Sequence, residues 1–593
     1  MRLADYIVEY LAEHGLNTAY AVTGRGALFI NDALAKTKQI RTIFPHHEQS
    51  AAFSACAAAD LTNNLQAVFV STGCASTNTL TGVLSAWQDS LPVIFISGQN
   101  ILHETTHYTG QKIRTYGQQE ADIIPIVSSI TKYAHMVTES KTIAYHLQRA
   151  VYEATTGNPG PVWLDIPLDL QSSQVDPKKM KNYSPKLTKL FFSDTTFSHC
   201  LETLSNSKRP VFLIGSGVKA SGYHTELEEL SIKFNIPITY THSAVDCIPL
   251  SFANTIGSVG SQGTSRSGAF AVQNADTVIV LGSRLNSLTT GPDFCKFARE
   301  ANVFVIDLDK APHEANQIAY KEVIHADIAE FIPAASTFLN EQCVFWGGWL
   351  KKCIDWKRDY ACPTEFRSTD REVDLYEFAV ALPDLMSDTG IFVCDSGFID
   401  VIMPTNAPFK KGQRCIRPVS QGSMGYALPA SVGVALSSDS AVYCVVGDGS
   451  IMFNLQELET IVRYNLNIKI CVISNDMYAV IKRRQKKLFR NRIIGVDFES
   501  GLKPLDFKKI ALAFGIEFFE CCAKNYIEQI SENSSSNGPQ IYEIPGKVDQ
   551  NYLEVHHAQT AQRKFVRRPL EDQKPFLPRE EFLANMIVTP IDQ

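Results

Sequence analysis

A short apolar run followed by a glycine-flanked aspartate is the clearest chemical signal in this sequence. Residues 441–446 are apolar and rich in β-branched or aromatic side chains, which predicts a buried strand. Gly447-Asp448-Gly449-Ser450 follows at once, and its glycines allow a tight turn that brings the backbone close to a ligand. The next predicted strand, residues 468–473, ends just before Asn475, which lies 27 positions after Asp448.

The two polar side chains are therefore expected at the carboxyl ends of two strands of one α/β sheet, where such sheets bind ligands. A carboxylate, an amide oxygen and a nearby backbone oxygen suit Mg²⁺ or Ca²⁺ carrying a diphosphate. A strand followed by Gly-Asp-Gly is also a common structural turn, so the metal interpretation depends on the rest of the chain. Between the two strands, residues 451–464 predict one amphipathic helix.

The elements that position these residues belong to a long chain of ordinary composition. It has 593 residues, 45% hydrophobic and 20% charged, with a formal net charge of −7, which argues against a general nucleic-acid binder. No apolar run approaches the roughly 18 residues of a membrane span, and the acidic N-terminus argues against a signal peptide. The 14 cysteines show no CxxC spacing, which favours buried thiols in a reducing compartment and a cytoplasmic protein.

Strand-like and helix-like segments alternate along most of the chain, which predicts an α/β fold of three doubly wound parallel-sheet domains. A polar stretch, residues 172–195, is expected to be a linker. The expected units are residues 1–172, 190–340 and 370–548, with a C-terminal tail at 549–593 near the active site that ends in a helix at 579–586.

A glutamate in the first expected unit, residues 1–172, adds to the evidence from Asp448 and Asn475. Glu48 precedes an Ala-rich helical run to Asp60, and by itself it would most simply be a solvated residue near a helix start. Together with Asp448 and Asn475, however, it resembles the thiamine diphosphate (ThDP) enzymes. In that family one domain supplies a Glu to the aminopyrimidine ring and another holds the diphosphate through a metal ion.

Three further segments resemble that family's cofactor loops, at residues 22–28, 72–78 and 421–430. The resemblance implies that Asp448, Asn475 and the carbonyl of Met477 bind Mg²⁺. It implies cofactor contacts from a set of loop residues: Thr23, Gly24, Thr72, Asn78, Gly422, Met424, Gly447, Gly449 and Ser450. Met424 would wedge between the two cofactor rings, although the alternative is a methionine of the core.

The resemblance also implies catalytic roles. Glu48 would assist removal of a weakly acidic C–H of the cofactor, which then acts as electron sink for a decarboxylating 2-keto acid. Gln119, in the segment Gln119-Glu120-Ala121-Asp122, would orient the keto acid. His46 or His47 would relay protons, although a histidine beside a glutamate is more often structural.

The subfamily that the chain resembles is that of acetohydroxyacid synthase and related pyruvate carboligases. The middle block matches segments that hold flavin adenine dinucleotide (FAD) there, although glycines after strands are equally compatible with empty turns. By resemblance the flavin would be a structural passenger. The FAD residues implied are Gly215, Gly217, Gly260, Gly282, Arg284, Asp309 and Asp327.

Two departures from acetohydroxyacid synthases point to a different acceptor. Leu168 stands where they usually have Lys, and Arg484 stands where they have Trp, within a run of five cations at 482–487. Such a run is usually a solvated helix face, but arginine at an active-site mouth can grip phosphate. We expect Arg484 and Ile481 to contact the substrate. Together with the C-terminal tail, these features resemble a branch of the family found with nucleotide-sugar pathways. That branch is similar to the carboligase of yersiniose biosynthesis.

The leading hypothesis is therefore a carboligase that decarboxylates pyruvate and transfers its two-carbon unit to a ketone of a nucleotide-linked deoxysugar. The alternatives are acetolactate synthesis from two pyruvates, simple 2-keto acid decarboxylation, and a catalytically dead binding subunit, against which intact Glu48, Asp448 and Asn475 argue. The resemblance also implies a homodimer or homotetramer in which two chains share each active site.

Overall fold

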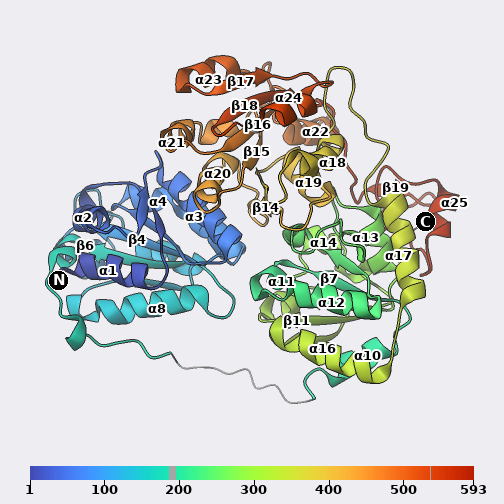
Figure 1. The fold of residues 1–593 in the computed structure, drawn as a ribbon, viewed down its shortest axis with the longest axis horizontal. Coiled ribbons are helices and arrows are strands. Elements are labelled where there is room, and N and C mark those ends of the chain that lie inside the picture. Colours follow the sequence, from blue (N-terminus) through green and yellow to red (C-terminus); the bar gives the residue numbers. More distant parts are fainter. Residues whose placement is uncertain (186–194, 535, 593) are drawn as a thin grey trace.

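Three α/β domains make up the computed structural model, which describes residues 1–185, 195–534 and 536–592. Each domain is built on a six-stranded sheet whose described strand pairs are all parallel, with helices on both faces (Figure 1). The predicted fold class is therefore confirmed. Part of the predicted linker, residues 186–194, lies outside the described residues.

The first domain has the strand order β2-β1-β3-β4-β6-β5. Its strands are β1 (Thr18–Ala21), β2 (Arg41–Ile43), β3 (Gln66–Val70), β4 (Val93–Gln99), β5 (Tyr133–Met136) and β6 (Val162–Pro167). Its main helices are α1 (Leu3–Glu13), α2 (Leu28–Lys36), α3 (Glu48–Thr62), α4 (Cys74–Asn78), α5 (Leu80–Gln88) and α8 (Ile143–Thr155).

The middle domain has the order β12-β11-β10-β7-β8-β9. Its strands are β7 (Pro210–Ile214), β8 (Ile238–Tyr240), β9 (Thr255–Ser258), β10 (Thr277–Leu281), β11 (Asn302–Asp307) and β12 (Tyr320–His325). Its main helices are α11 (Ser216–Ser221), α12 (His224–Phe234), α13 (Arg266–Gln273), α15 (Ala311–Ala315), α16 (Ile328–Gln342) and α17 (Gly347–Tyr360). Because α17 packs on α13, this domain extends beyond residue 340.

The third domain repeats the order of the first, as β14-β13-β15-β16-β18-β17. Its strands are β13 (Ile391–Cys394), β14 (Arg414–Ile416), β15 (Val442–Gly447), β16 (Ile468–Ser474), β17 (Glu517–Glu520) and β18 (Gln540–Pro545). Its main helices are α18 (Leu375–Leu385), α19 (Phe398–Asn406), α20 (Ala427–Leu436), α21 (Glu457–Arg463), α22 (Ala479–Leu488), α23 (Phe507–Phe514) and α24 (Tyr526–Asn533).

These strand orders place one crevice in each sheet. The chain leaves β1 and β3 in opposite directions across the sheet, and the same holds for β7 and β10 and for β13 and β15. At such switch points the carboxyl ends of neighbouring strands open a ligand-binding crevice. The order of the middle sheet is also that of dinucleotide-binding domains.

The helix expected over residues 451–464 is interrupted. A single 3-10 turn at Ile451–Phe453 precedes α21, which begins at Glu457. Between them the side chain of Asn454 donates to the Gly425 carbonyl at 2.7 Å and to Gln49 Oε1 at 3.2 Å. An asparagine that bonds to distant groups in this way competes with the helix, which explains the break.

The domains contact one another through α3 and through ion pairs. Helix α3 of the first domain packs against α20 of the third, at the centre of Figure 1. At the other end of α3, Lys219 Nζ of the middle domain lies 2.8 Å from Asp60 and 3.5 Å from Asp246. Arg414 of the third domain pairs with the same Asp246 at 2.8 Å, so one half-buried network joins three domains.

The tail after residue 549 packs on the middle domain. It contains β19 (His557–Gln559), β20 (Phe565–Arg567) and α25 (Arg579–Ala584), the last shorter than the helix predicted at 579–586. Glu571 pairs with Arg299 at 2.8 Å, and the carbonyl of Asn585 accepts a bond from Asn274.

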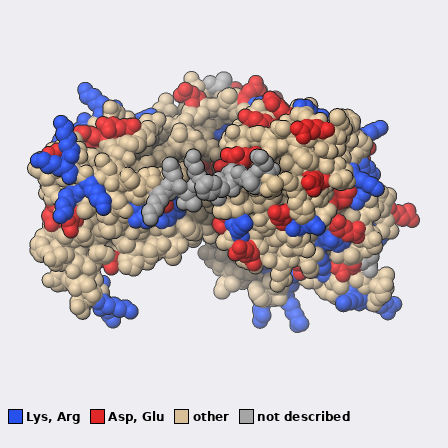
Figure 2. All heavy atoms as spheres, turned by 90° about the horizontal axis from the view of Figure 1, so that it is seen from below, with Lys and Arg blue, Asp and Glu red and all other residues tan. Residues whose placement is uncertain are grey.

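On the face seen in Figure 2, acidic and basic side chains are interspersed at the left margin and on the right, with a largely uncharged area between them. Among the described helices, none combines the length and the apolar character needed to cross a membrane.

Candidate active site

Asp448 lies at the switch point of the third sheet, at the end of β15. Its carboxylate accepts three backbone N–H bonds, from Gly449 at 2.7 Å, Asn475 at 2.9 Å and Asp476 at 2.6 Å. These bonds hold the carboxylate in one orientation and join the ends of β15 and β16. Burial raises the pKa of Asp448 above its ordinary value, and the three N–H donors oppose that rise.

Asn475 supplies a second oxygen beside this carboxylate. Its Oδ1 is buried and has no hydrogen-bond partner among the described residues. A buried polar atom without a partner costs about 1–3 kcal/mol, so this oxygen is suited to an outside ligand. The residue after it, Asp476, has φ of 58°, a strained backbone of the kind found at functional sites. A fixed carboxylate and an orphan amide oxygen, with Met477 two residues further on, fit Mg²⁺.

Asp395, at the end of the neighbouring strand β13, belongs to the same site. Its Oδ2 accepts bonds from Ser450 Oγ at 2.7 Å and from the N–H groups of Gly425 and Ala427 at 3.1 and 3.3 Å. Its Oδ1 is buried without a partner among the described residues, and burial raises its pKa to about 7. The sequence reasoning missed Asp395, although Asp395-Ser396-Gly397 after an apolar run is the same signal as Gly447-Asp448-Gly449.

The segment that carries Met424 lies beside Asp395 and Ser450, both of which accept a hydrogen bond from the Gly425 N–H. Gly422 and Gly425 have φ of 59° and 77°, so the segment needs glycine at both positions. The side chain of Met424 is half-buried and lies outside the hydrophobic clusters formed by the described residues. A methionine held between two glycine turns and away from the core fits the predicted cofactor contact better than the core alternative.

Glu48 and Asn78 meet in the first domain. Asn78 Nδ2 donates to Glu48 Oε2 at 2.9 Å, although 30 residues separate the two. Glu48 is the first residue of α3, so its carboxylate lies at the positive end of the helix. His47 is the N-cap of α3, and its Nδ1 accepts from the Gln49 N–H at 3.1 Å, a structural role. Its proton relay stays a prediction.

Gln119 lies on a strained loop that packs on the predicted cofactor loop. Its φ is 56°, in the left-handed region that non-glycine residues rarely adopt. A Cβ atom added at Gly73 would overlap the carbonyl oxygen of Gln119, so the two loops are in close contact. Glu120 secures the loop by accepting the N–H bonds of Tyr116 and Gly117 at 3.0 and 2.9 Å.

The buried carboxyl group of Asp165 supports the loops that carry Thr72 and Gln119. Asp165 accepts from Ser97 Oγ at 2.6 Å and from Gln99 Nε2 at 3.2 Å, and burial raises its pKa to about 7. Gln99 in turn accepts from Thr72 Oγ1 at 2.5 Å and donates to the Ala121 carbonyl at 3.1 Å. Sequence reasoning missed both supports, because strand interiors look alike from the sequence.

The remaining predicted residues of this domain follow β1. Thr23 is exposed, while Gly24 packs so closely on Ser71 that any Cβ atom there would overlap it. Thr23 and Gly24 follow the carboxyl end of β1 and Thr72 follows that of β3, while Asn78 bonds to Glu48 and Gly73 contacts Gln119.

Hydrogen bonds connect this cluster with the third domain in the same chain. Gln49 Oε1, beside Glu48, accepts from Asn454, which also bonds to the Gly425 carbonyl. Ser50 Oγ donates to Asn454 Oδ1 at 3.0 Å. The start of α3 is therefore held against the Met424 segment. The structure holds one chain, so the predicted sharing of a site between two chains stays a prediction.

A cavity of about 340 Å³ opens at the switch point of the middle sheet, with walls from all three domains. Its lining includes Gly217, Gly282, Arg284, Asp309 and Asp327 of the predicted flavin residues. Gly215 and Gly260 do not line it: Gly215 packs on Gly282 and Ser283, and Gly260 on His242. Asp309 and Asp327 accept N–H bonds from Ala311 and Ala329 next to α15 and α16.

The cavity's chemistry fits a dinucleotide. His242 lines it and has a buried Nδ1 without a partner among the described residues. Arg284 donates to Ser420 Oγ of the third domain at 3.0 Å, so a cation lies where the domains meet. The position of the cavity and the strand order of its sheet are those of a dinucleotide site, and flavin binding stays a prediction.

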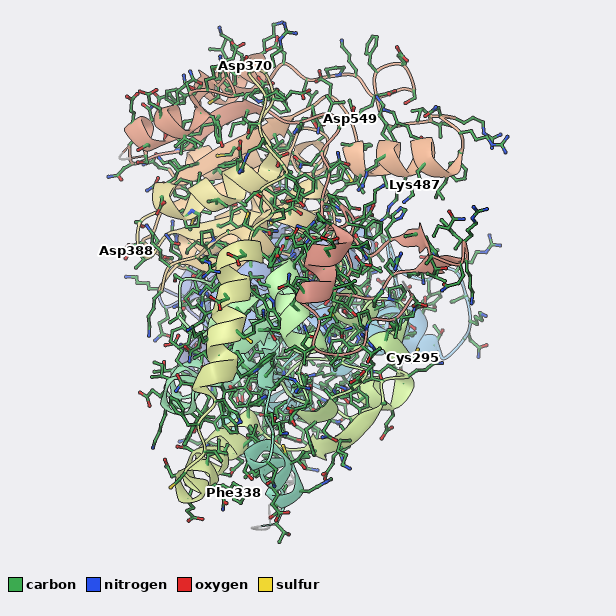
Figure 3. All side chains as sticks on the ribbon, turned by 90° about the vertical axis from the view of Figure 1, so that its right-hand side faces the viewer. Cys295, Phe338, Asp370, Asp388, Lys487 and Asp549 are labelled. Atoms are coloured by element: carbon green, nitrogen blue, oxygen red, sulfur yellow. The ribbon has the colours of Figure 1, made fainter. Side chains whose placement is uncertain are left out.

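Ile481 and Arg484 lie on α22, which begins two residues after the predicted metal ligand Met477. Both side chains are exposed, and Arg484 makes no ion pair or side-chain hydrogen bond with the described residues. Its neighbour Arg483 faces inward, where it pairs with Glu554 at 3.0 Å and lies 4.5 Å from the Tyr552 ring. Figure 3 shows α22, with Lys487 labelled, at the outer edge of the molecule.

Family models match all three domains. A model described as "Thiamine pyrophosphate enzyme, N-terminal TPP binding domain" matches residues 1–126, the corresponding central-domain model matches 197–335, and the C-terminal TPP binding domain model matches 395–543. The matches include Glu48 and Gln119 in the first model and Asp448 and Asn475 in the last.

Curated relatives are similar over most of the chain. The acetolactate synthase isozyme 1 large subunit of Escherichia coli is 28% identical over 522 residues, covering 87% of this chain and 88% of the relative. The isozyme 2 large subunit of the same bacterium is 26% identical over 548 residues, covering 92% and 95%. An acetolactate synthase of Arthrospira platensis is 26% identical over 586 residues, covering 91% and 93%.

Proposed function

This chain belongs to the thiamine diphosphate enzyme family, and we propose that it decarboxylates pyruvate and joins the resulting two-carbon unit to a second carbonyl compound. The observation that carries the proposal is the pair of oxygens at the ends of β15 and β16. Asp448 is fixed by three N–H donors, and Asn475 Oδ1 is buried without a described partner. Relatives named acetolactate synthases support the reaction class.

Each residue of the site has a task in this reaction. When bound, thiamine diphosphate supplies the electron sink that decarboxylation of a 2-keto acid needs. Asp448, Asn475 and the Met477 carbonyl would hold the metal ion, and Gly447, Gly449 and Ser450 would line the diphosphate end. Glu48 would accept and return a proton at its carboxylate, with Asn78 holding its Oε2. Gln119 would orient the keto acid from its strained loop.

For the acceptor, we propose a ketone on a nucleotide-linked deoxysugar. Leu168 in place of the usual lysine and Arg484 in place of the usual tryptophan support this choice. Arg484 also has no described partner and so can bind a phosphate bidentately. Acetolactate synthesis from two pyruvates is the second candidate, and the names of the curated relatives favour it.

We propose that FAD resides in the middle-domain cavity at the β7–β10 crevice, where Gly217, Gly282 and Arg284 would hold it. A flavin that only supports the structure would need no redox partner in the reaction. Absorbance near 450 nm in the purified protein, released by denaturation, would support it.

Product analysis tests the acceptor. Labelled pyruvate is incubated with the protein, ThDP and Mg²⁺, with and without a CDP-linked 4-keto-deoxysugar, and every product is identified by mass. A branched sugar two carbons larger is expected only with the sugar. Strong acetolactate formation from pyruvate alone, with no branched product, would favour the second candidate. Arg484→Ala should raise the KM for the nucleotide-linked acceptor far more than that for pyruvate.

A further inference from the structure

Residues 479–495 form an arm that projects from the predicted metal loop. Its two ends are closed by the bond from the Tyr478 N–H to the Val496 carbonyl, 2.8 Å, and by the Lys482–Asp497 ion pair, 2.8 Å. At its base Tyr478 packs against Gly449, where a Cβ atom would overlap its ring. The arm therefore rests on the Gly447-Asp448-Gly449-Ser450 turn.

The charge of the arm is unlike that of the chain around it. Seven of its 17 residues are Lys or Arg and none is Asp or Glu, in a chain whose net charge is −7. Lys482 and Arg483 pair inward, Lys486 lies 3.8 Å from the exposed Asp549, and Lys487 bonds to His556. The three arginines Arg484, Arg490 and Arg492 are exposed and make no ion pair with the described residues.

The tip of the arm also presents apolar side chains to solvent. Leu488, Phe489 and Ile494 are 68%, 48% and 75% exposed. They flank a turn in which Arg490 and Asn491 both have positive φ, 52° and 65°. Two successive non-glycine residues in the left-handed backbone region store strain of the kind found at ligand clamps. Figure 3 shows α22, with Lys487 labelled, at the edge of the molecule.

An exposed aromatic ring among unpaired arginines matches a ligand with a flat ring and adjacent phosphates. Arginine binds phosphate oxygens bidentately, and a nucleic-acid base stacks favourably on an aromatic ring whatever its sequence identity. Pyruvate, with one carboxylate, is too small for this surface. A second copy of the arm is disfavoured, because two such arms would place like charges opposite each other.

We propose that the arm is the docking site for a nucleoside diphosphate, with Arg490 and Arg492 joining Arg484 in binding the phosphates and Phe489 stacking on the base. This inference rests on the proposed function, since it names the part of the nucleotide-linked acceptor that the arm holds. The arm's base on the Gly449 turn then brings the attached sugar toward the proposed reaction centre.

Binding is measured without catalysis. The full-length protein, saturated with ThDP and Mg²⁺ so that the cofactor site is filled, is titrated by calorimetry with CDP, UDP and ADP, and with pyrophosphate and cytidine separately. We expect at least one nucleoside diphosphate to bind at least tenfold more tightly than pyrophosphate or cytidine. Arg490→Ala/Arg492→Ala should weaken that binding at least tenfold, while ThDP affinity changes less than twofold. Phe489→Ala should weaken CDP binding but not pyrophosphate binding.

A matched control removes the same charge elsewhere. Lys503→Ala/Lys508→Ala takes away two exposed cations outside the arm and should leave the affinity unchanged. The proposal is overturned if no nucleoside diphosphate binds the wild type, or if the control pair weakens binding as much as the arm pair. Equal affinity for CDP and pyrophosphate, with no effect of Phe489→Ala, would reduce the arm to a phosphate site and overturn base recognition.

The outcome is separable from that of the proposed function. CDP binding that depends on the arm, without any branched product from a CDP-linked ketosugar, would overturn the proposed acceptor reaction and leave the docking site standing. A branched product formed equally well by wild type and Arg490→Ala/Arg492→Ala would overturn the docking site and leave the reaction standing.

Discussion

At the scale of single residues, the two oxygens of the proposed metal site differ in how the fold treats them. Asp448 is satisfied by three backbone donors, whereas Asn475 Oδ1 has no described partner. The carboxylate is thus oriented before any ligand arrives, and the amide oxygen is left for one. Glu48 lies in the first domain, at the start of α3, whereas both oxygens follow strands of the third domain. This separation means that anchoring and proton transfer can be tested apart.

Glu48→Gln and Asp448→Ala should have opposite signatures. Glu48→Gln removes the proton acceptor and should lower kcat by roughly 10²–10⁴-fold, while ThDP affinity falls only a few-fold. Asp448→Ala removes a metal ligand and should weaken ThDP–Mg²⁺ binding by roughly 100-fold. Fluorescence titration with ThDP and steady-state kinetics separate the two. Glu9→Gln, on the exposed side of α1, is the control; unchanged activity in Glu48→Gln would contradict the role of Glu48.

Asp165 makes stability depend on pH. Its ordinary pKa of 3.8 is raised to about 7 by burial, so between these values the folded protein keeps a proton that the unfolded chain has lost. The stability that this group contributes therefore falls as pH rises toward 7, by at most about 1.4 kcal/mol per pH unit. Asp165→Asn cannot ionise, so its stability relative to wild type should rise between pH 5 and 8.

Urea unfolding at several pH values measures this difference, and subtraction of the wild-type curve cancels the other buried carboxyls. Asp439→Asn, at an exposed position, should track the wild type. A variant whose difference from wild type does not change with pH would contradict the raised pKa.

At the scale of elements, the loops rather than the strands give the site its shape. The Gln119 loop is pressed against Gly73 and is held from behind by Gln99 and Asp165. The backbone at Gln119 is strained, so its position depends on that packing. Similarly, α3 is held at one end by Asn454 and at the other by Lys219.

Gly73→Ala should displace the Gln119 loop, because its new Cβ would overlap the Gln119 carbonyl. A shift of about 1 Å in a substrate-orienting group can cost about 100-fold in rate, so kcat/KM for pyruvate should fall by that order. Gly110→Ala is a close control, since its φ of 63° nearly equals the 65° of Gly73 and nothing lies within 4 Å. Equal losses in both variants would attribute the effect to backbone strain alone.

At the scale of the whole molecule, three crevices share one architectural origin. The first and third sheets have the same strand order and carry the two halves of the proposed cofactor site, while the middle sheet has the dinucleotide order and carries the cavity. The half-buried ion-pair network of Asp60, Lys219, Asp246 and Arg414 connects the three domains.

Mixing two inactive variants tests whether two chains share a site. If Glu48 of one chain serves Asp448 of another, subunit exchange between Glu48→Gln and Asp448→Ala creates dimers with one intact site. Random exchange would then restore about a quarter of wild-type activity in a two-fold dimer. Light scattering gives the mass of the mixture. No recovery after demonstrated exchange would place both residues of each site in one chain.

From the sequence one could predict three parallel α/β domains and the turn that carries Asp448, because periodicity and glycine turns are local. Apolar runs marked the strands, and the Gly-Asp-Gly signal marked Asp448. The helix expected over 451–464 was wrong in its continuity, since the bonds of Asn454 to Gln49 and Gly425 come from distant segments.

Tertiary structure alone decided which of these residues meet and which have partners. The Glu48–Asn78 bond, the orphan oxygens of Asn475 and Asp395, and the contact of Gly73 with Gln119 all join segments that the sequence keeps apart. Local patterns record whether a residue prefers a strand, a helix or a turn. They do not record strand order, which determines the crevice at which distant side chains converge.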